Sequence, residues 1–544
     1  MYSEIKTGAV WGVSAYMVSV EVDIASGLPA FNMVGSLGKE VRESRERVCV
    51  ALKNAGLSIP AAHITVNLSP ADQKKEGTAF DLPIAVGILQ CMDYFDAGTT
   101  EEILFLGELG LNGEIKTVRG VLPIVREAAL RGMKECIVPL ENAWEGAVIP
   151  GIRVRGAAHI VEVLEYLRHK KRSLENGKDV EEERFAEEIL PVTDVMGQVE
   201  DGEKGRGYSG DKDEKSACGK EEALSKLPDF AGIRGQESAK RAAEIAAAGF
   251  HNLLMTGPPG VGKSMIAKCI PGILPPLTEE ERLEVTAVYS VAGLLTGKNP
   301  LLKERPFQSP HHTISQAALT GGSAIPKPGV ISLSHRGVLF LDELPEFQRS
   351  ALDSLRQPLE ERRVHIARVG GNIIYPADFM LVCAMNPCPC GYYPDRNRCK
   401  CSEVAIRRYM GKVSGPILDR MDLCVELLPV NIGCLQEKSK AESSGEIRER
   451  IIRARHRQES RFAGTGYRFN ADMSASDVER FCVLGTEEKK CVEEIFKRLH
   501  LSARAYHRML KVARTIADLS GEKSITTEHL LEAACYRPVS EYWG

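Results

Sequence analysis

Long apolar segments are the first feature that this sequence lacks. Among its 544 residues, no apolar run approaches the roughly 20 residues that a membrane helix requires. The N-terminal segment, Met1 to Val10, also lacks the basic patch and apolar stretch of a secretory signal. We therefore expect no membrane association and a cytoplasmic location.

A strong charge imbalance and a disulfide framework are missing as well. The 70 Lys and Arg residues nearly balance the 74 Asp and Glu residues, giving a net charge of -4. This balance neither supports nor excludes a nucleic-acid partner, so local basic clusters must decide that question. The 15 cysteines lie in a long chain without a signal, where reduced thiols or metal ligands are more common than disulfides.

The hydrophobic pattern predicts a multidomain α/β protein, since 544 residues are too many for one core. Val18, Val20 and Val22 alternate with polar residues as in a half-buried strand, and the segment between Gly38 and Gly56 has helical spacing. Further strands are expected at residues 64–68, 103–106 and 135–138, and helices at 82–89 and 122–130. This alternation predicts an α/β domain over residues 1–165.

Composition then changes twice along the chain. Residues 166–226 are rich in Glu, Lys, Asp and Gly with few aromatics, which predicts a charged flexible linker. A second α/β domain is expected over residues 227–435. Residues 436–544 have helical spacing and predict a small helical domain.

A phosphate-binding loop opens the second domain. It consists of Gly257, Pro258, Pro259, Gly260, Val261, Gly262, Lys263 and Ser264, and fits G-x-x-x-x-G-K-[ST]. A strand-like segment at 252–255 precedes it and a helix-like segment at 265–270 follows, which argues against a chance glycine-rich turn. Backbone amides of such a loop face phosphate, the lysine contacts the β and γ phosphates, and the serine binds Mg²⁺. The sequence predicts a site for ATP and Mg²⁺.

Two further strands supply polar side chains for this site. An apolar strand over residues 337–341 ends in Asp342 and Glu343, which would bind Mg²⁺ and polarise the attacking water. Adjacent acids also cap helices, so this assignment depends on the phosphate-binding loop. The strand at 379–385 ends at Asn386, whose amide could position water near the γ phosphate.

With these elements the sequence resembles the AAA+ ATPases, in which Asn386 takes the place of sensor 1. The resemblance implies that Arg420, in the segment 418–422, is an arginine finger that reaches the γ phosphate of a neighbouring subunit. It also implies that Arg504, in the segment 501–505, is sensor 2. A surface salt bridge remains the alternative for either arginine.

A closer resemblance covers almost the whole chain apart from the linker. The sequence is similar to the ComM/YifB family of magnesium-chelatase-like AAA+ proteins in the stretches 31–35, 76–83, 309–313, 337–343, 386–391 and 501–519. The resemblance implies a homo-hexameric ATPase that drives DNA branch migration in recombination or natural transformation. An ATP-driven remodelling or metal-chelatase-type subunit that acts on a protein partner is the alternative.

The N-terminal domain resembles the Lon protease domain, which makes peptidase activity a further alternative. Lon-type chemistry needs a serine activated by a lysine. In this chain Ala79 occupies the serine position and Leu122 the lysine position. We therefore expect a Lon-like but non-proteolytic domain that acts as a scaffold or contacts DNA.

A basic hairpin is the main candidate for a DNA contact. Strands are expected at 363–368 and 373–375 with a turn at Gly370, Gly371 and Asn372. The family resemblance places a pore hairpin here, so Arg363, His365 and Arg368 are candidate phosphate contacts. An ordinary basic surface hairpin is the alternative. A second group of arginines, over residues 448–461, is equally consistent with a solvated face.

Four cysteines follow Asn386 in two close pairs, Cys388 with Cys390 and Cys399 with Cys401. Four thiolates suit tetrahedral Zn²⁺, although the C-x-C spacing differs from the commoner C-x-x-C. Four reduced thiols in a loop are the alternative to a zinc site. His311 and His312 have no accompanying acid or cysteine pattern, and we interpret them as structural or close to DNA.

Overall fold

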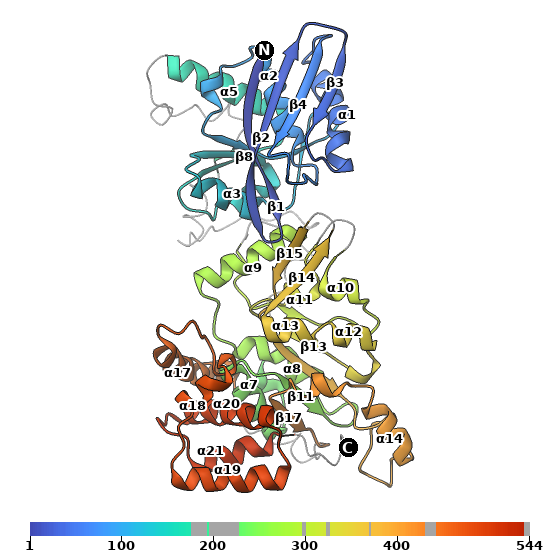
Figure 1. Cartoon of the computed structure of the whole chain (residues 1–544), viewed down its shortest axis with the longest axis vertical. Helices are drawn as coiled ribbons and strands as arrows, with labels where there is room; N and C mark the ends of the chain where they lie inside the picture. The colour runs from blue at the N-terminus through green and yellow to red at the C-terminus, as the bar shows by residue number, and fades with distance from the viewer. Residues whose placement is uncertain are drawn as a thin grey trace, which may run out of the picture.

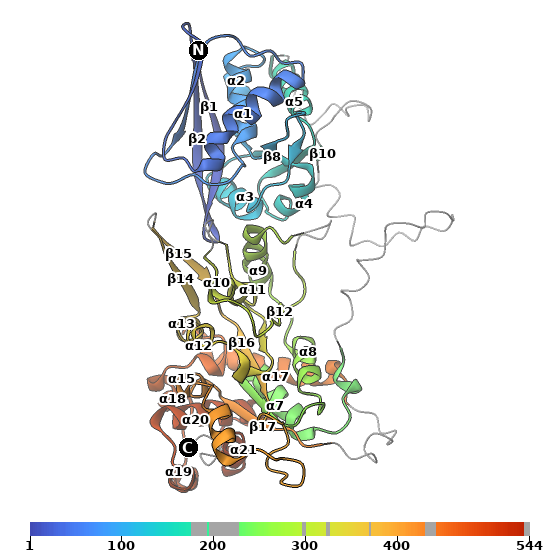
Figure 2. The ribbon, with the colours of Figure 1, turned by 90° about the vertical axis from the view of Figure 1, so that its right-hand side faces the viewer.

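The computed structural model describes residues 1–175, 193–194, 228–295, 301–322, 327–368, 371–429 and 442–537. The molecule is elongated, with an N-terminal α/β body at one end, a second α/β body below it and the C-terminal helices at the other end (Figure 1). A quarter turn shows the same stacking (Figure 2). Within the described ranges, no helix has the length and apolar character needed to cross a bilayer.

The N-terminal body contains an eight-stranded mixed sheet with the order β10-β9-β8-β5-β1-β2-β4-β3. Its strands are β1 (Tyr2–Trp11), β2 (Ser14–Ala25), β3 (Ala30–Val34), β4 (His63–Ser69), β5 (Ile103–Phe105), β8 (Glu135–Pro139), β9 (Arg153–Ala157) and β10 (Thr193–Asp194). A small ribbon is formed by β6 (Glu108–Leu109) and β7 (Ile115–Lys116). The helices are α1 (Lys39–Asn54), α2 (Asp81–Cys91), α3 (Val121–Leu130), α4 (Ala143–Gly146) and α5 (Ile160–Glu175).

The predicted strands and helices of this body are confirmed, because apolar periodicity and burial coincide. Val18, Val20 and Val22 of β2 are buried, and Val41 and Val48 are on the buried face of α1. Helix α5 continues to Glu175, past the predicted boundary at residue 165. Apart from α5 and β10, the predicted linker lies outside the described residues.

The second body contains a parallel five-stranded sheet with the order β12-β13-β16-β11-β17. Its strands are β11 (Leu253–Thr256), β12 (Phe307–Gln308), β13 (Val338–Leu341), β16 (Met380–Met385) and β17 (Leu423–Glu426). Its helices are α7 (Glu237–Gly249), α8 (Lys263–Ile273), α9 (Glu279–Ala292), α10 (Gln316–Thr320), α11 (Val330–Leu333), α12 (Arg349–Asp353), α13 (Arg356–Glu361), α14 (Glu403–Met410) and α15 (Gly415–Leu418). Ligands of such sheets bind beyond the carboxyl ends of the strands.

A separate hairpin of β14 (Arg363–Arg368) and β15 (Gly371–Pro376) projects from this body toward the N-terminal domain (Figures 1 and 2). The predicted turn is displaced, because Arg368 pairs with Gly371 and Ala367 with Asn372. Gly371 and Asn372 are therefore strand residues, and positions 369–370 between the strands lie outside the described residues.

The C-terminal helices are α17 (Ser444–Phe462), α18 (Ala475–Phe481), α19 (Thr486–Leu499), α20 (Ala503–Ser520) and α21 (Thr527–Cys535). They share one apolar core with the sheet body, since Ile451 of α17 and Ile516 of α20 lie in the same buried cluster as Ala246 of α7 and Ile266 of α8. The helical region is thus fixed against the helices that flank β11.

Helix α9 connects the two α/β bodies. Its Ser290 donates a hydrogen bond to the buried Glu145 carboxylate, and the Ser290 carbonyl accepts the Gly120 N–H at 3.1 Å. Burial raises the pKa of Glu145. Leu283 and Ala287 of α9 pack in the apolar cluster of the N-terminal domain, so the contact is apolar as well as polar.

Candidate nucleotide site

The phosphate-binding loop is folded around its own lysine. Lys263 is 8% exposed, and its Nζ donates to the carbonyl oxygens of Gly257 at 2.6 Å and Pro258 at 2.9 Å. Gly260 and Gly262 have φ values of +79° and +98°, which β-carbon-bearing residues rarely adopt. Burial lowers the pKa of Lys263, and the nearby Asp342 carboxylate partly opposes this shift.

The predicted Mg²⁺ ligands face one another. Ser264, in the first turn of α8, donates a hydrogen bond from Oγ to Asp342 Oδ2 at 2.6 Å. Asp342 directly follows β13, so its carboxylate lies at the carboxyl edge of the sheet. A hydroxyl and a carboxylate are hard oxygen donors of the kind that Mg²⁺ takes alongside phosphate oxygens and water. These residues fit a Mg²⁺-nucleotide complex.

Asn386 joins the same group of side chains. Its Oδ1 accepts a hydrogen bond from Lys263 Nζ at 3.0 Å. The parallel register explains this contact, because Thr256 pairs with Met385 and the next residues, Gly257 and Asn386, leave the sheet side by side. The structure therefore brings Lys263, Ser264, Asp342 and Asn386 together.

Glu343 has an unusual backbone and an unpredicted partner. Its φ of +52° is in the left-handed region, and its N–H donates to Asp342 Oδ1 at 2.9 Å. Its Oε2 lies 3.3 Å from Nδ1 of His312, which in turn packs against His311. Such backbone strain in a non-glycine residue is typical of functional positions.

The position of His312 follows from strand register. Strands β12 and β13 pair in parallel with Phe307 opposite Val338. His312 and Glu343 each lie five residues beyond this pair, so the segments that follow the two strands bring these residues together. Sequence reasoning missed this contact because the residues are far apart in the chain and no local pattern links them.

Arg420 and Arg504 lie away from the phosphate-binding loop of their own chain. Arg420 follows α15; its guanidinium donates to the Pro416 carbonyl at 2.6 Å and to the Glu360 carboxylate, and its carbonyl accepts from the Asn252 side chain at 3.0 Å. Asn252 precedes β11, whereas the phosphate-binding loop follows it. The four residues of β11 separate these ends by about 13 Å.

The two arginines share a basic cavity of about 210 Å³. It is lined by Glu360, Asp419, Arg420, Ala475, Arg504, His507, Arg508 and Lys511. Arg420 is mostly buried, and burial lowers its pKa and that of Lys511. No residue of the phosphate-binding loop lines this cavity. Within one chain, Arg420 and Arg504 line the same cavity, and Lys263 does not line it.

The hairpin presents polar residues on one face. Val364 and Ile366 are buried, whereas Arg363 and His365 are exposed, and His365 Nε2 lies 3.3 Å from Glu361. The side chain of Arg368 lies outside the described residues.

The second arginine group, on α17, is largely used within the chain. Arg450 pairs with Glu244 at 2.6 Å, Arg461 pairs with Asp518, and the Arg455 guanidinium lies 3.8 Å from the Phe469 ring centroid. These contacts attach α17 to its neighbours and give it a packing role.

The N-terminal domain carries apolar groups at the two Lon positions. Ala79 packs against the cluster that contains the fully buried Leu122. The Leu122 N–H donates to Glu145 at 2.9 Å, which places this residue near the contact with α9. Neither side chain offers the hydroxyl or amine that the serine-lysine chemistry requires.

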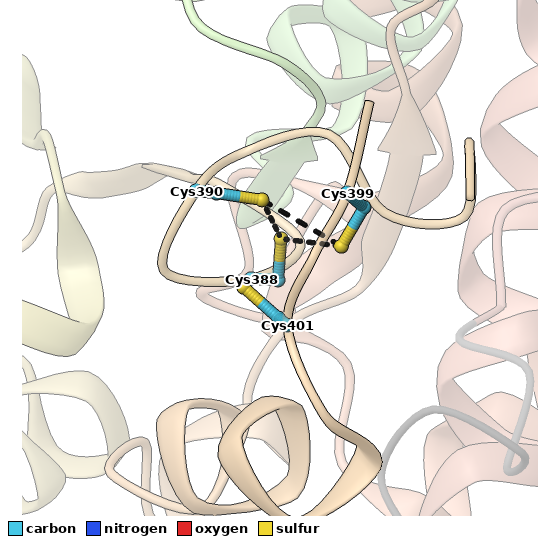
Figure 3. A group of neighbouring side chains, drawn as sticks. All are labelled: Cys388, Cys390, Cys399 and Cys401. Atoms are coloured by element: carbon cyan, nitrogen blue, oxygen red, sulfur yellow. Dashed lines mark hydrogen bonds between the residues drawn. The ribbon is translucent and has the colours of Figure 1, made fainter. Parts of the chain in front are cut away.

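The four cysteines after Asn386 come together. Their Sγ atoms all lie within 4.8 Å of one another, and no other group of three or more His, Cys, Asp or Glu residues in the described ranges is placed to hold a metal ion. Figure 3 shows three of the sulfurs in mutual contact, with Cys401 beside Cys388. The structure thus confirms the proximity that a metal site needs.

Comparison with known proteins gives matches along most of the chain. The family model described as "Magnesium chelatase, subunit ChlI" matches residues 229–434. "Subunit ChlI of Mg-chelatase" matches residues 20–142, and "Magnesium chelatase, subunit ChlI C-terminal" matches residues 441–537. These three matches contain the nucleotide site, the Lon-like region and the C-terminal helices.

Curated relatives extend the match to full length. The competence protein ComM of Haemophilus influenzae is 42% identical over 531 residues, which cover 97% of this chain and 96% of ComM. YifB of Escherichia coli is 40% identical over 538 residues, covering 99% and 97%. The magnesium-chelatase 67 kDa subunit of Chlorobaculum tepidum is 27% identical over 206 residues, covering 37% of this chain and 27% of that protein. The chain therefore belongs to the ComM/YifB family of magnesium-chelatase-like AAA+ ATPases.

Proposed function

We propose that this chain is an ATP-hydrolysing, ring-forming DNA motor that drives branch migration in recombination or natural transformation. The observation that carries the ATPase part is the contact between Lys263 and Asn386 beside the Ser264–Asp342 pair. These groups follow the carboxyl ends of three neighbouring strands of one parallel sheet, β11, β13 and β16. Such an arrangement is suited to a Mg²⁺-nucleotide and leaves Glu343 next to it as the base for water.

Each side chain has a definite task in this proposal. Lys263 neutralises the β and γ phosphates, while Ser264 and Asp342 hold Mg²⁺, which supplies further charge neutralisation when bound. Glu343 accepts a proton from the attacking water, and Asn386 orients that water. His312, 3.3 Å from the Glu343 carboxylate, positions it.

The oligomeric part rests on the separation of the arginines from Lys263. Arg420 and Arg504 line a basic cavity at the amino end of β11. A cavity with this many cations suits an anion, and the chain's own nucleotide lies at the other end of the strand. A ring in which each subunit presents this cavity to its neighbour's γ phosphate completes every site, and a hexamer is the assembly that we propose.

The DNA part rests on two observations. One of the relatives that match over nearly their whole length, ComM of Haemophilus influenzae, is named a competence protein, whereas the magnesium-chelatase subunit matches over 37% of this chain. The hairpin β14–β15 also presents Arg363 and His365 on an exposed face. Contacts from Arg363, His365 and Arg368 to phosphates would give binding that depends on salt but not on base sequence. An activity of this kind operates in the cytoplasm.

ATPase stimulation tests this function against the alternative of a protein-remodelling or chelatase-type subunit. Purified protein is assayed with a four-way DNA junction, single-stranded DNA, duplex DNA or an unfolded protein substrate. We expect the junction to give the largest stimulation and labelled strands to be exchanged only with ATP. Stimulation by the protein substrate but by none of the DNAs would reject the DNA motor.

A matched pair of variants tests the hairpin. Arg363→Ala should weaken junction binding and reduce its dependence on salt. Arg498→Ala removes an exposed cation from α19, which lies at the end of the molecule away from the hairpin (Figure 1), and should leave both unchanged. Equal losses in the two variants would show that the hairpin has no special part in DNA binding.

A further inference from the structure

The four-cysteine loop has the dimensions of a single-ion site. The Sγ atoms of Cys388, Cys390 and Cys399 are separated by 3.3, 3.7 and 3.6 Å, and Cys401 completes the group within 4.8 Å (Figure 3). Thiolates bound to one zinc ion at about 2.3 Å in a tetrahedron lie about 3.8 Å apart. The observed separations are close to that value.

Other uses of four close cysteines fit less well. A disulfide needs sulfurs about 2.05 Å apart, and all four cysteines are free thiols. An iron-sulfur cluster must fit several irons and bridging sulfides between the ligands, which separations of 3.3–3.7 Å do not allow. A soft four-sulfur set that closes around one centre favours zinc.

The surrounding backbone is arranged around the sulfurs. The N–H of Tyr393 donates to Cys388 Sγ at 3.4 Å, an interaction that stabilises a thiolate. The loop between Asn386 and Ser402 contains no helix or strand. Its aromatic residues stack with cations at its surface, Arg398 over Tyr392 at 4.0 Å and Arg396 over Tyr393 at 5.0 Å. An irregular loop with so little regular hydrogen bonding gains most from a metal cross-link.

This loop also contacts the nucleotide site directly. It begins at Cys388, two residues after Asn386, and Gly391 lies against the phosphate-binding loop. A β-carbon at Gly391 would lie 2.6 Å from Cδ of Pro259, and the φ of Gly391 is +84°. Only glycine accommodates both the contact and the backbone conformation. The cysteine loop therefore follows Asn386 directly in the chain and packs against Pro259 of the phosphate-binding loop.

We propose that Cys388, Cys390, Cys399 and Cys401 bind one zinc ion, and that this ion braces the phosphate-binding loop and Asn386 through the Gly391–Pro259 contact. The metal is structural, since four protein sulfurs leave no open position for substrate. The second part of the proposal rests on the proposed ATPase function, whereas the first part does not.

Metal content tests the first part. Full-length protein purified without chelator should contain about one zinc per chain by elemental analysis, with no iron. Cys390→Ser/Cys399→Ser should contain almost none, whereas Cys49→Ser/Cys535→Ser, which changes two thiols outside the cluster, should retain it. Wild-type protein without zinc, whose four cluster thiols all react with a thiol reagent, would overturn the site.

Trypsin provides a readout that is independent of ATP. Arg396, Arg398 and Lys400 lie between the cysteine pairs and are exposed. Removal of zinc by a chelator should speed cleavage at these positions in wild type, and the Cys390→Ser/Cys399→Ser variant should be cut rapidly without chelator. Cleavage that is equally slow with and without zinc would contradict a bracing role.

Gly391→Ala separates metal binding from the brace. This variant retains all four cysteines and should keep its zinc, but should bind a fluorescent ATP analogue about tenfold more weakly, because strain of this kind displaces one of the two loops. Gly415→Ala, with open space around the position, is the matched control. Normal nucleotide binding by Gly391→Ala would remove the brace and leave the zinc site; absence of nucleotide binding in wild type would reject the ATPase proposal and leave the metal result standing.

Discussion

The groups of side chains beside the two ends of strand β11 differ: one contains the phosphate-binding lysine and its partners, and the other contains arginines without that loop. At its carboxyl end, Lys263 contacts Asn386 and Ser264 contacts Asp342. At its amino end, Arg420 and Arg504 line a basic cavity that contains no residue of the phosphate-binding loop. In our proposal, the carboxyl end holds a nucleotide and the amino end contacts an anion from outside the chain. This difference is the basis for our proposal that a single subunit carries two halves of two different sites.

Lys263→Ala should cause the largest loss at the carboxyl end. Because Lys263 is the loop's cation, ATP turnover should fall by at least about 100-fold, as measured by phosphate release. Lys268→Ala, five residues further along α8 and exposed, is the control and should behave as wild type. Wild-type turnover by Lys263→Ala would show that the nucleotide binds elsewhere.

Glu343→Gln should separate binding from hydrolysis at the same end. The amide keeps the shape of the side chain but cannot accept a proton, so turnover should fall about 10²–10⁴-fold, while affinity for an ATP analogue stays near wild type. Loss of binding in this variant would instead assign Glu343 a structural role at its strained backbone position.

His312→Ala should have a smaller effect because His312 acts through Glu343. We expect kcat to fall up to about tenfold with KM for ATP unchanged, and His312→Asn to recover part of the loss. His311→Ala is the neighbouring control, since its Nδ1 contacts Thr313 and not Glu343. A change in KM with kcat preserved would contradict a positioning role.

Asp422→Asn, beside the amino end of β11, should lower the stability of the folded protein. Burial alone would raise the pKa of Asp422, but Arg508 at 3.3 Å and hydrogen bonds to the carboxylate outweigh it and hold the pKa below its usual range. A carboxyl group whose pKa is lower in the folded protein than in the unfolded chain stabilises the fold at pH values above its unfolded pKa of about 3.9. This stabilisation is lost as the pH falls below that value toward the folded pKa.

The variant should therefore unfold a few degrees lower than wild type at neutral pH, and its midpoint should change less than that of wild type on acidification below about pH 4. Thermal scans across this range provide the measurement. Asp419→Asn, which changes a carboxylate lining the cavity of Arg420 and Arg504, is the control. Parallel pH dependence in wild type and Asp422→Asn would show that Asp422 does not carry the effect.

Sequence predicted the carboxyl end of the sheet better than the amino end. Motifs such as residues 257–264 are local, and the strands that carry Asp342 and Asn386 have continuous apolar runs, so pattern and structure agree. The hairpin turn was misplaced because pairing of Val364 with Tyr375 and Ile366 with Ile373 sets the register, which the glycine pattern alone does not reveal.

Contacts between segments that are distant in the chain were the features of the site that the sequence did not predict. The contact of His312 with Glu343 depends on the register of β12 with β13. The contact of Gly391 with Pro259 depends on how an irregular loop folds back on the sheet edge. The shared cavity of Arg420 and Arg504 depends on how α20 lies beside α13 and the segment after α15.

The central claim is that one subunit's arginines complete its neighbour's nucleotide site, and mixed rings test it most directly. Arg420→Ala alone should bind ATP but not hydrolyse it, and Lys263→Ala alone should do neither. When the two are mixed equally, about a quarter of the interfaces combine an intact Lys263 with an intact Arg420 from the next subunit.

The measurement is phosphate release by this mixture across a range of ratios, beside a control mixture of Lys263→Ala with the Lys263→Ala/Arg420→Ala double variant, which cannot form a complete site. We expect activity to appear in the first mixture, to be greatest near equal proportions, and to stay at background in the control. Activity that remains at background at every ratio, in rings shown to contain both variants, would contradict it.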